Sequence, residues 1–308
     1  MVDLETAERL AAESAVAVAS ERDVLRITGR DAVSYLQGQL SQDVEGLAVG
    51  ATTRTLLLQP QGKIDAWMRM HRRSPDEVLL DVEPGFGAGA KERLERFKLR
   101  VDADIELRTV PTLAVRGPES RRVAGEVVDA VEGLLSLDAA WPGIDGVDLL
   151  DPTGETDPGS HLPDGLFVGP ADVLELVRIR HGLPAMGREL DGSTIPAAAG
   201  IVDQSVDFTK GCYVGQELVA RIDSRGSKTP TRLYGLRFAG SALPAAGDAL
   251  LLDGAPAGTV TSVAVSPDSG AVGLGYLKRS VAVPATLAVG SSDRDLVAEA
   301  TELPAPAS

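Results

Sequence analysis

The chain has 308 residues, of which 44% are hydrophobic and 24% are charged, a composition typical of a globular protein with two or three domains of about 100 residues each. Its formal net charge of -15 disfavours nucleic-acid binding by bulk charge, although it leaves a tRNA substrate open. One cysteine excludes an internal disulfide, and the absence of a long apolar run or a basic leader predicts a cytoplasmic protein with no membrane segment.

The first 115 residues combine strand patterns with helix patterns. Apolar residues alternate over 23–28, and Pro60, Gln61 and Gly62 supply the turn expected between antiparallel strands. We predict strands over 23–28, 53–58, 63–72, 77–82, 103–110 and 113–115, and helices over 31–44 and 87–99. This order predicts an α+β fold for the segment.

Two further segments follow, 116–229 and 230–308. In the first of them we predict helices over 119–131, 171–181 and 217–222, and loops over 145–165 and 187–207. In the second, short apolar runs separated by turns predict a small antiparallel β-barrel with strands over 233–238, 249–252, 258–265 and 271–276. The expected domains are therefore 1–115, 116–229 and 230–308.

The most informative segment holds the only cysteine. It reads Lys210-Gly211-Cys212-Tyr213-Val214-Gly215-Gln216-Glu217. Its two glycines allow a turn and a close approach of main chain to a ligand. An ammonium and turn amides beside a thiol favour the thiolate, so we expect a nucleophilic or metal-binding Cys212, with a small buried side chain as the alternative.

Other polar positions are weaker candidates. Arg178 and Arg180 lie near a predicted helix end, where guanidinium groups clamp carboxylates or phosphates; a solvated surface is the alternative. Asp65 faces either a cleft or solvent, and solvent is favoured.

The glycine-rich run 85–90 lacks the spacing of a dinucleotide loop, so we expect a flexible turn. The charged run 91–100 is typical of the solvated face of a helix.

A resident metal is not expected. A structural zinc or iron–sulfur site takes about four thiolate or imidazole ligands, and the whole chain has only Cys212, His71, His161 and His181 to supply them. A cluster shared between two chains stays open, as does His181 as a base for the thiol, because the spacing demonstrates no adjacency.

Three stretches carry a resemblance to a known family. They are Arg178-x-Arg180-x-Gly182-Leu183-Pro184, Ile195-Pro196 and the run 206–221 that contains the cysteine. Together they resemble the signature of YgfZ-type folate-binding proteins, which are iron–sulfur-enzyme maturation factors related to the glycine-cleavage aminomethyltransferase. Upstream residues, among them Gly29, Asp31 and Gly117-Pro118, are similar to the amino-terminal region of that superfamily, so the resemblance covers nearly the whole chain.

The resemblance implies two ferredoxin-like α+β domains and a carboxy-terminal six-stranded β-barrel around a central cavity that holds tetrahydrofolate or a folate derivative. It places Lys210 and Cys212 at the border of that cavity, and we take these two residues as the catalytic candidates. The wider set of expected folate-binding residues is Lys210, Gly211, Cys212, Tyr213, Gly215, Gln216, Glu217, Arg178, Arg180 and Asp65.

Two departures from the transferase pattern bear on function. The related aminomethyltransferases carry paired aspartates where this chain has Asp65 and Ala66, and a glutamate where it has Arg180. A guanidinium cannot accept hydrogen bonds from the N–H groups of a pterin. The second departure therefore disfavours folate binding, and the first disfavours an intact transferase site.

On these grounds we predict a folate-binding protein that supports the assembly or repair of iron–sulfur clusters in client enzymes, with Cys212 in transient contact with a cluster. Its expected partners are folate and iron–sulfur client or assembly proteins. One alternative is a tetrahydrofolate-dependent aminomethyl or one-carbon transferase acting on a protein or a tRNA. Another is a folate-binding module without chemistry.

Overall fold

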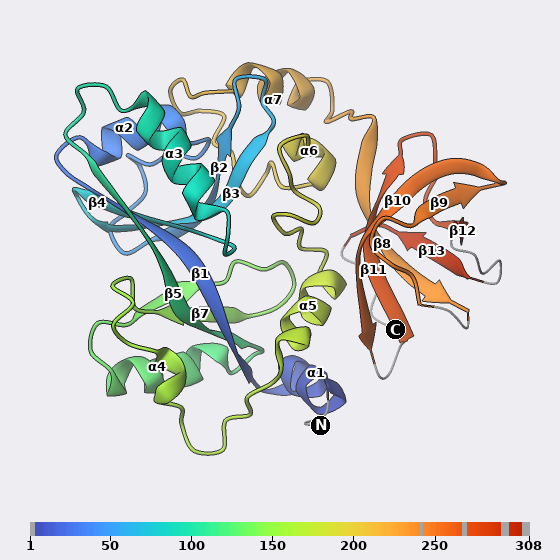
Figure 1. The fold of residues 1–308 in the computed structure, drawn as a ribbon, viewed down its shortest axis with the longest axis horizontal. Coiled ribbons are helices and arrows are strands. Elements are labelled where there is room, and N and C mark those ends of the chain that lie inside the picture. Colours follow the sequence, from blue (N-terminus) through green and yellow to red (C-terminus); the bar gives the residue numbers. More distant parts are fainter. Residues whose placement is uncertain (1–3, 241–242, 267–269, 291–295, 304–308) are drawn as a thin grey trace.

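The computed structural model describes residues 4–240, 243–266, 270–290 and 296–303. A seven-stranded antiparallel sheet with packed helices is followed by a closed six-stranded barrel (Figure 1). The helices are α1 (Leu4–Glu13), α2 (Ala32–Gln39), α3 (Gly87–Phe97), α4 (Ser120–Ala130), α5 (Ala171–Arg180), α6 (Pro196–Ala199) and α7 (Gln216–Asp223), with a 3₁₀ turn at Pro158–Ser160. The sheet strands are β1 (Val16–Thr28), β2 (Thr52–Leu58), β3 (Ile64–Ser74), β4 (Glu77–Val82), β5 (Asp104–Arg116), β6 (Leu135–Asp138) and β7 (Gly146–Leu150).

Two long strands form the centre of the sheet. The strand order is β2-β3-β4-β1-β5-β7-β6, and β1 pairs with β5 along its whole length, from Val16 opposite Arg116 to Thr28 opposite Asp104. Both strands run through the upper and lower halves of the sheet in Figure 1. The expected mixture of helices and an antiparallel sheet is confirmed. The division into two ferredoxin-like domains stays a prediction, because β1 and β5 belong to both halves.

The sheet contains more strand than the sequence pattern predicted. The expected loop 145–165 contains β7, whose five residues are all buried. The expected strands 103–110 and 113–115 form the single strand β5. Pro111 is tolerated inside it because β7 pairs with β5 only from Thr112 onward, which leaves that edge open beside the proline.

Two helices were not predicted, and a third ends earlier than expected. The helix α1 was not predicted, and α6 lies within the expected loop 187–207. The helix expected over 31–44 ends at Gln39, because Leu40 turns to an extended conformation. That early end leaves the carbonyl groups of the last helical turn available to other segments.

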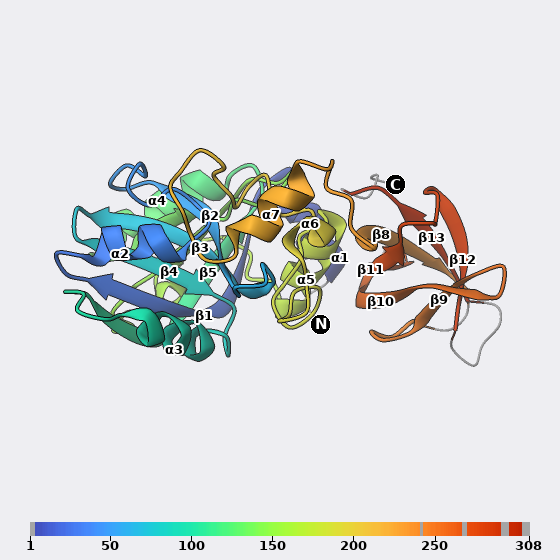
Figure 2. The same cartoon turned by 90° about the horizontal axis from the view of Figure 1, so that it is seen from above.

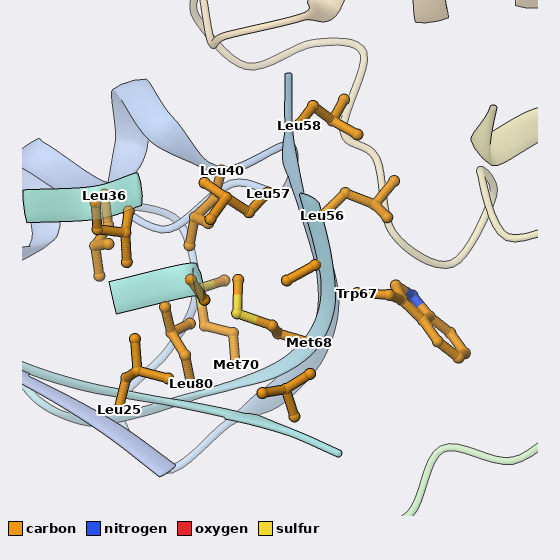
Figure 3. Packing of buried hydrophobic residues seen from close by; sticks show 14 of the residues in the cluster. Leu25, Leu36, Leu40, Leu56, Leu57, Leu58, Trp67, Met68, Met70 and Leu80 are labelled. Atoms are coloured by element: carbon orange, nitrogen blue, oxygen red, sulfur yellow. The ribbon is translucent and has the colours of Figure 1, made fainter. Parts of the chain in front are cut away.

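The hydrophobic core of the upper half lies between α2, α3 and the strands β2 to β4. Figure 3 shows Leu36 and Leu40 of the α2 region packed toward Met68 and Met70 of β3, all of which are fully buried. Burying side chains of this size contributes about 1.5–3 kcal/mol each. Trp67 points to the opposite face of the strand, as the two-residue repeat of a strand requires.

A buried ion network ties the two halves of the sheet together. Arg69 on β3 donates from Nε to Asp81 at 2.8 Å and from Nη1 to Asp148 on β7 at 2.7 Å. Arg116 on β5 reaches the other oxygen of Asp148 at 2.8 Å. Burial alone would raise the pKa of Asp148, but the charges of Arg116 and Arg69 hold it below its usual range.

The carboxy-terminal barrel has its own core. Its strands are β8 (Thr231–Ala239), β9 (Ala249–Leu252), β10 (Ala255–Ser266), β11 (Gly270–Lys278), β12 (Ala285–Val289) and β13 (Val297–Thr301), closed in the order β10-β11-β8-β13-β12-β9. The expected antiparallel barrel is confirmed. In both views α5 and α6 lie between the sheet and the barrel (Figures 1 and 2), so α5 connects the two bodies.

Candidate functional site

The segment 207–217, called here the signature loop, is fixed at its first end by Lys210. The ammonium nitrogen Nζ donates to the carbonyl oxygens of Gln37 and Leu40 at 2.7 Å each and to that of Gln42 at 2.9 Å. These carbonyls lie at the carboxyl end of α2, where the helix dipole favours a cation. All three ammonium protons therefore have acceptors.

A second set of hydrogen bonds joins the same segments. The amide of Asp207 donates to the carbonyl of Ser41 at 3.0 Å, and the hydroxyl of Ser41 donates to the carbonyl of Ser205 at 2.6 Å. Trp67 donates from Nε1 to the hydroxyl of Ser205 at 2.8 Å. Asp207 also accepts hydrogen bonds from the amide and hydroxyl of Thr209 at 2.7 Å each. The stretch before the cysteine is thus held against the residues that follow α2.

At its other end the signature loop rests on the turn between β2 and β3. Gly215 has φ +83°, and a Cβ atom there would lie 2.5 Å from the carbonyl oxygen of Gln59. Gly62 in the turn has φ +70°, and its Cβ would lie 2.7 Å from the Cβ of Leu218. A side chain at either glycine would clash. Gly215 therefore serves a close backbone contact with the protein itself.

Cys212 lies between these two anchors and is exposed. Its neighbour Gly211 is also exposed, and a Cβ atom there would meet nothing within 4 Å. Tyr213 turns inward to the core beside the sheet, and burial raises its pKa to about 12. Gln216 accepts a hydrogen bond from the amide of Tyr213 at 3.2 Å, and Glu217 is exposed in the first turn of α7. The thiol is the solvent-facing tip of a fixed loop.

The buried position of Lys210 affects its charge. Burial lowers the pKa of its ammonium group to about 8, against the opposing charges of Asp43 and Asp207. Activation of the Cys212 thiol by this ammonium stays a prediction. The contacts give Lys210 a clear first role, which is to hold the signature loop on the end of α2.

The arginines predicted near the end of α5 lie in a different environment. Arg178 is buried and donates to Glu175 at 2.6 and 2.9 Å, to Glu189 at 3.0 Å, to the carbonyl of Leu183 at 2.7 Å and to Ser262 of the barrel at 2.8 Å. Burial opposes its charge, but the hydrogen bond to Glu175 and the charge of Glu189 raise its pKa above the ordinary value. The neighbouring Arg180 donates to Ser266 of β10 at 2.8 Å.

Glu189, which the sequence did not single out, is the centre of this cluster. Its side chain is fully buried and accepts hydrogen bonds from the amide of Ala185 at 3.0 Å, Thr261 at 2.8 Å and Ser262 at 2.5 Å. Its carbonyl accepts from the hydroxyl of Tyr276 at 2.9 Å. These contacts join the segment after α5 to two barrel strands, so the cluster functions as a joint between the sheet and the barrel.

Asp65 occupies a β-bulge. Leu57 of β2 pairs with Ala66, but the next residue, Leu58, pairs with Ile64, so Asp65 is the extra residue on β3. A bulge redirects a side chain out of the regular alternation. Here the Asp65 carboxylate accepts a hydrogen bond from Nε of Arg93 on α3 at 3.2 Å.

A pocket of about 350 Å³ opens at this bulge, between α3 and the β2–β3 turn. It is lined by Gln59, Pro60, Gln61, Asp65, Gly89, Glu92, Arg93 and Arg96. The side chain of Arg93 is only 11% exposed, although the charged run 91–100 predicted a solvated helix face. The pattern of alternating charges gave no sign that one of these arginines turns inward.

The structure brings some of the candidates together and separates others. The β2–β3 turn contacts Gly215 on the signature loop and also lines the Asp65 pocket. Arg178 and Arg180 instead contact the barrel. In the glycine-rich run 85–90, the amides of Gly85 and Gly87 donate to the carboxylate of Asp23, so these amides are not available to a phosphate group.

Neither a metal-binding cluster nor a membrane-spanning helix occurs within the described ranges. There, no three His, Cys, Asp or Glu side chains are grouped closely enough to hold a metal ion. The helices of the same ranges include none that is long and apolar enough to cross a membrane.

Comparison with known proteins gives matches along nearly the whole chain. Residues 231–305 match the glycine cleavage T-protein C-terminal barrel domain. An uncharacterized protein of Haemophilus influenzae is 30% identical over 210 residues, which cover 68% of each chain. The aminomethyltransferase of Streptomyces avermitilis is 28% identical over 311 residues, covering 86% of this chain and 78% of that one.

Two further matches agree with these. A putative chloroplastic transferase of Arabidopsis thaliana is 27% identical over 303 residues, covering 89% of this chain and 68% of the relative. The crystal structure of the glycine cleavage system aminomethyltransferase T from Bartonella henselae superposes with a TM-score of 0.85 at 18% identity, covering 98% of this chain and 89% of that one. The fold is therefore that of the glycine cleavage T-proteins, from the first helix to the barrel.

Proposed function

The chain belongs to the same family as the uncharacterized Haemophilus influenzae protein and has the glycine cleavage T-protein fold, and from this premise we propose that it binds tetrahydrofolate and supports the assembly or repair of iron–sulfur clusters in client enzymes. This proposal makes it a YgfZ-type protein. The observation that carries the proposal is the exposed thiol of Cys212 on a loop fixed at both ends.

Folate binding is supported by the relatives and by the pocket at Asp65. A volume of about 350 Å³ lies at the lower end of the range for small-molecule sites, so the pocket would enclose one end of a folate. Its lining combines carboxylate, amide and guanidinium groups, which suit a ligand with both donors and acceptors. Bound folate would supply a one-carbon carrier beside the signature loop.

The role of the thiol is proposed from its position. A client or assembly protein can reach a side chain at the tip of a loop without any rearrangement of the core. The anchors at Lys210 and Gly215 keep the loop from collapsing over Cys212. In this proposal the Cys212 thiol coordinates iron in a cluster on the partner, or exchanges with one of the ligands of that cluster. The anchors at Lys210 and Gly215 hold the thiol in position.

Folate binding is tested by isothermal calorimetry of the wild type with tetrahydrofolate under anaerobic, reducing conditions. We expect micromolar binding. The comparator is Arg180→Glu, which restores the carboxylate found at this position in the transferases. Binding by this variant but not by the wild type would contradict the folate part of the proposal and leave only the thiol loop.

The cluster role is tested in cells that lack the protein, by measuring the activity of iron–sulfur enzymes after complementation. We expect Cys212→Ser to fail, and Asp65→Asn to restore activity. The protein level of each variant is measured alongside, so that a loss of activity is not mistaken for a loss of protein. Because Cys212 is exposed, we expect Cys212→Ser to change the free energy of unfolding by no more than about 0.5 kcal/mol. Full rescue by Cys212→Ser would sink the cluster role.

The second candidate is a tetrahydrofolate-dependent aminomethyl or one-carbon transferase. It is favoured by the similarity to the Streptomyces avermitilis aminomethyltransferase over 86% of this chain and by the place of Asp65 in a pocket. In that case the pattern of the complementation experiment is reversed: Asp65→Asn abolishes activity and Cys212→Ser retains it.

A further inference from the structure

A group of exposed cations follows the signature loop in the chain. Residues 221–228, called here the basic segment, contain Arg221, Arg225 and Lys228 but a single carboxylate, that of Asp223. All four residues are exposed, and none of the three cations forms an ion pair within the described part of the chain. The basic segment is therefore a local excess of positive charge on a protein whose net charge is -15.

This lack of pairing differs from the pattern on other helices. On α1, α3 and α4 an exposed arginine is paired with a glutamate three or four residues away. Arg221 follows Glu217 by four residues on α7, but these two side chains form no ion pair. The helix dipole favours a cation in the last turn of α7, where Arg221 lies, but its effect ends there and does not extend to Lys228.

The backbone of the basic segment forms an ordered turn. The carbonyl of Ile222 accepts hydrogen bonds from the amides of Arg225 at 3.2 Å and Ser227 at 3.0 Å, and the amide of Gly226 donates to the carbonyl of Asp223 at 2.8 Å. The cations are thus carried by a backbone that is already fixed. A partner that binds them does not have to order this stretch of chain first.

An apolar side chain lies on the other side of Cys212. Phe208 is 48% exposed, although it is part of the signature loop. The carboxylate of Asp207 accepts hydrogen bonds from the amides of Thr209 at 2.7 Å and Lys210 at 3.2 Å, so the backbone around Phe208 is fixed. Aromatic residues and arginines are enriched in the contact regions of protein interfaces.

The helix α7 connects Phe208 and Cys212 to the basic segment. It has eight residues, so its length is about 12 Å, and Figure 1 shows it along the upper edge of the molecule. A standard interface covers about 800 Å² on each partner, a patch about 30 Å across. One partner protein is therefore large enough to contact Phe208 and the basic segment while it reaches Cys212.

We propose that Phe208 and the basic segment form the docking surface for an acidic face of the cluster-carrying partner, and that docking brings the cluster to Cys212. The inference rests on the proposed cluster role and adds the chemistry of the partner. A cluster held by four thiolates is itself anionic, because the ligand charges exceed that of the usual iron–sulfur core. A nucleic acid fits less well, since the net charge of -15 repels a long polyanion beyond the local patch.

The first test measures whether the basic segment attracts anions to Cys212. The probes are dithiobis(nitrobenzoate), an aromatic disulfide with two carboxylates, and the neutral dithiodipyridine. The Cys212 thiolate attacks one sulfur of the probe, the S–S bond breaks, and one aromatic thiolate is released for each mixed disulfide formed. Because Cys212 is the only cysteine in the chain, the released thiolate reports this residue alone.

The variant Arg221→Gln/Arg225→Gln/Lys228→Gln, called here the basic-segment variant, lacks the three cations. At low salt we expect it to react about threefold more slowly than the wild type with the anionic probe and at the same rate with the neutral one. High salt removes the difference, because it screens the charges. The matched control Arg9→Gln/Arg121→Gln/Arg122→Gln also lacks three exposed arginines, and it reacts like the wild type with both probes.

The second test uses the natural partners, in cells that lack the protein. The activity of iron–sulfur enzymes is measured after complementation with the basic-segment variant, with Phe208→Ser and with the matched control. We expect the first two to restore about a third or less of the wild-type activity at equal protein level, which is the loss expected when interface contacts are removed, and the control to restore all of it.

The outcomes separate this inference from its premise. Full rescue by the basic-segment variant and by Phe208→Ser, with failure of Cys212→Ser, overturns the docking surface and leaves the cluster role intact. Full rescue by Cys212→Ser overturns the cluster role and this inference with it. Equal slowing of both probes in the basic-segment variant shows a change in the thiol itself and overturns the attraction of anions.

Two further outcomes assign the surface to another occupant and overturn the proposal as well. One is a dimer of the wild type that is lost in the basic-segment variant, as measured by sedimentation. The other is binding of a transfer RNA by the wild type that is lost in the same variant, as measured by fluorescence anisotropy. A monomeric wild type that binds no transfer RNA supports a protein partner.

Discussion

The joint around Glu189 and the signature loop around Cys212 are both rich in polar residues, but they use them in opposite ways. In the joint the charged groups of Glu189 and Arg178 are buried and bonded to other parts of the protein. In the signature loop the bonded groups lie at the two ends, and the thiol between them faces solvent. The arginine motif and the cysteine motif therefore have different tasks, although they are close in the sequence.

The difference shows how to separate a structural cluster from a binding site. A buried charge is costly unless its partners satisfy it, so a saturated cluster stabilises one arrangement of the chain. A binding or catalytic site instead keeps at least one reactive or hydrogen-bonding group free of partners within the protein. By this criterion the exposed Cys212 is a candidate for function, whereas Arg178 is a residue of the joint.

The largest effect is expected when the joint is broken. Glu189→Ala leaves Arg178 and three further donors without their acceptor, so we expect the free energy of unfolding to fall by about 3–5 kcal/mol. Glu126→Ala is the matched control, because Glu126 also pairs with an arginine at 2.6 Å but is 47% exposed; its cost is about 0–1 kcal/mol. Chemical denaturation measures both. Equal losses would mean that the joint is no more important than a surface pair.

A smaller effect separates the two glycines of the signature loop. Gly215→Ala places a side chain at φ +83° and 2.5 Å from a backbone oxygen, so we expect a loss of about 2–4 kcal/mol. Gly211→Ala meets nothing within 4 Å and has no positive φ, so its effect stays within about 0.5 kcal/mol. Similar losses at both positions, measured by the same denaturation, would show that the loop is not held on the β2–β3 turn.

The sequence singled out the signature loop because its signal is local. Glycines, a lone thiol and alternating polar groups within eight residues identified the segment around Cys212. The anchors could not be predicted, because the carbonyl of Gln37 lies 173 positions before Lys210. Such a contact depends on how α2 ends, and the early end of that helix at Gln39 was itself missed.

The same limit applies to the fold. Four of the six barrel strands were found because turns separate short apolar runs, whereas β12 and β13 were missed, and β7 was hidden in a segment rich in Asp, Pro and Gly. The strand is recognisable only once its pairing with β5 is known. Glu189 and Arg93 escaped for a related reason: each is an ordinary charged residue in the sequence, and only the tertiary structure buries it.

The smallest effect concerns the charge of Lys210 and its pH dependence. Burial lowers the pKa of this ammonium from 10.5 to about 8, so between these values the unfolded chain binds more protons than the folded one. Wild-type stability should therefore rise with pH relative to Lys210→Met, which has no such group.

We expect a gain on the order of 1 kcal/mol between pH 8 and 10.5 and no change below pH 8, because Lys210 is only half-buried and solvent screens its charge. Denaturation of both proteins across this range measures the difference. If wild type instead loses stability relative to the variant as the pH rises, the three carbonyl groups of the α2 end stabilise the ammonium more than burial destabilises it. The anchor would then be stronger than its burial suggests, and the signature loop would resemble the joint in depending on a satisfied charge.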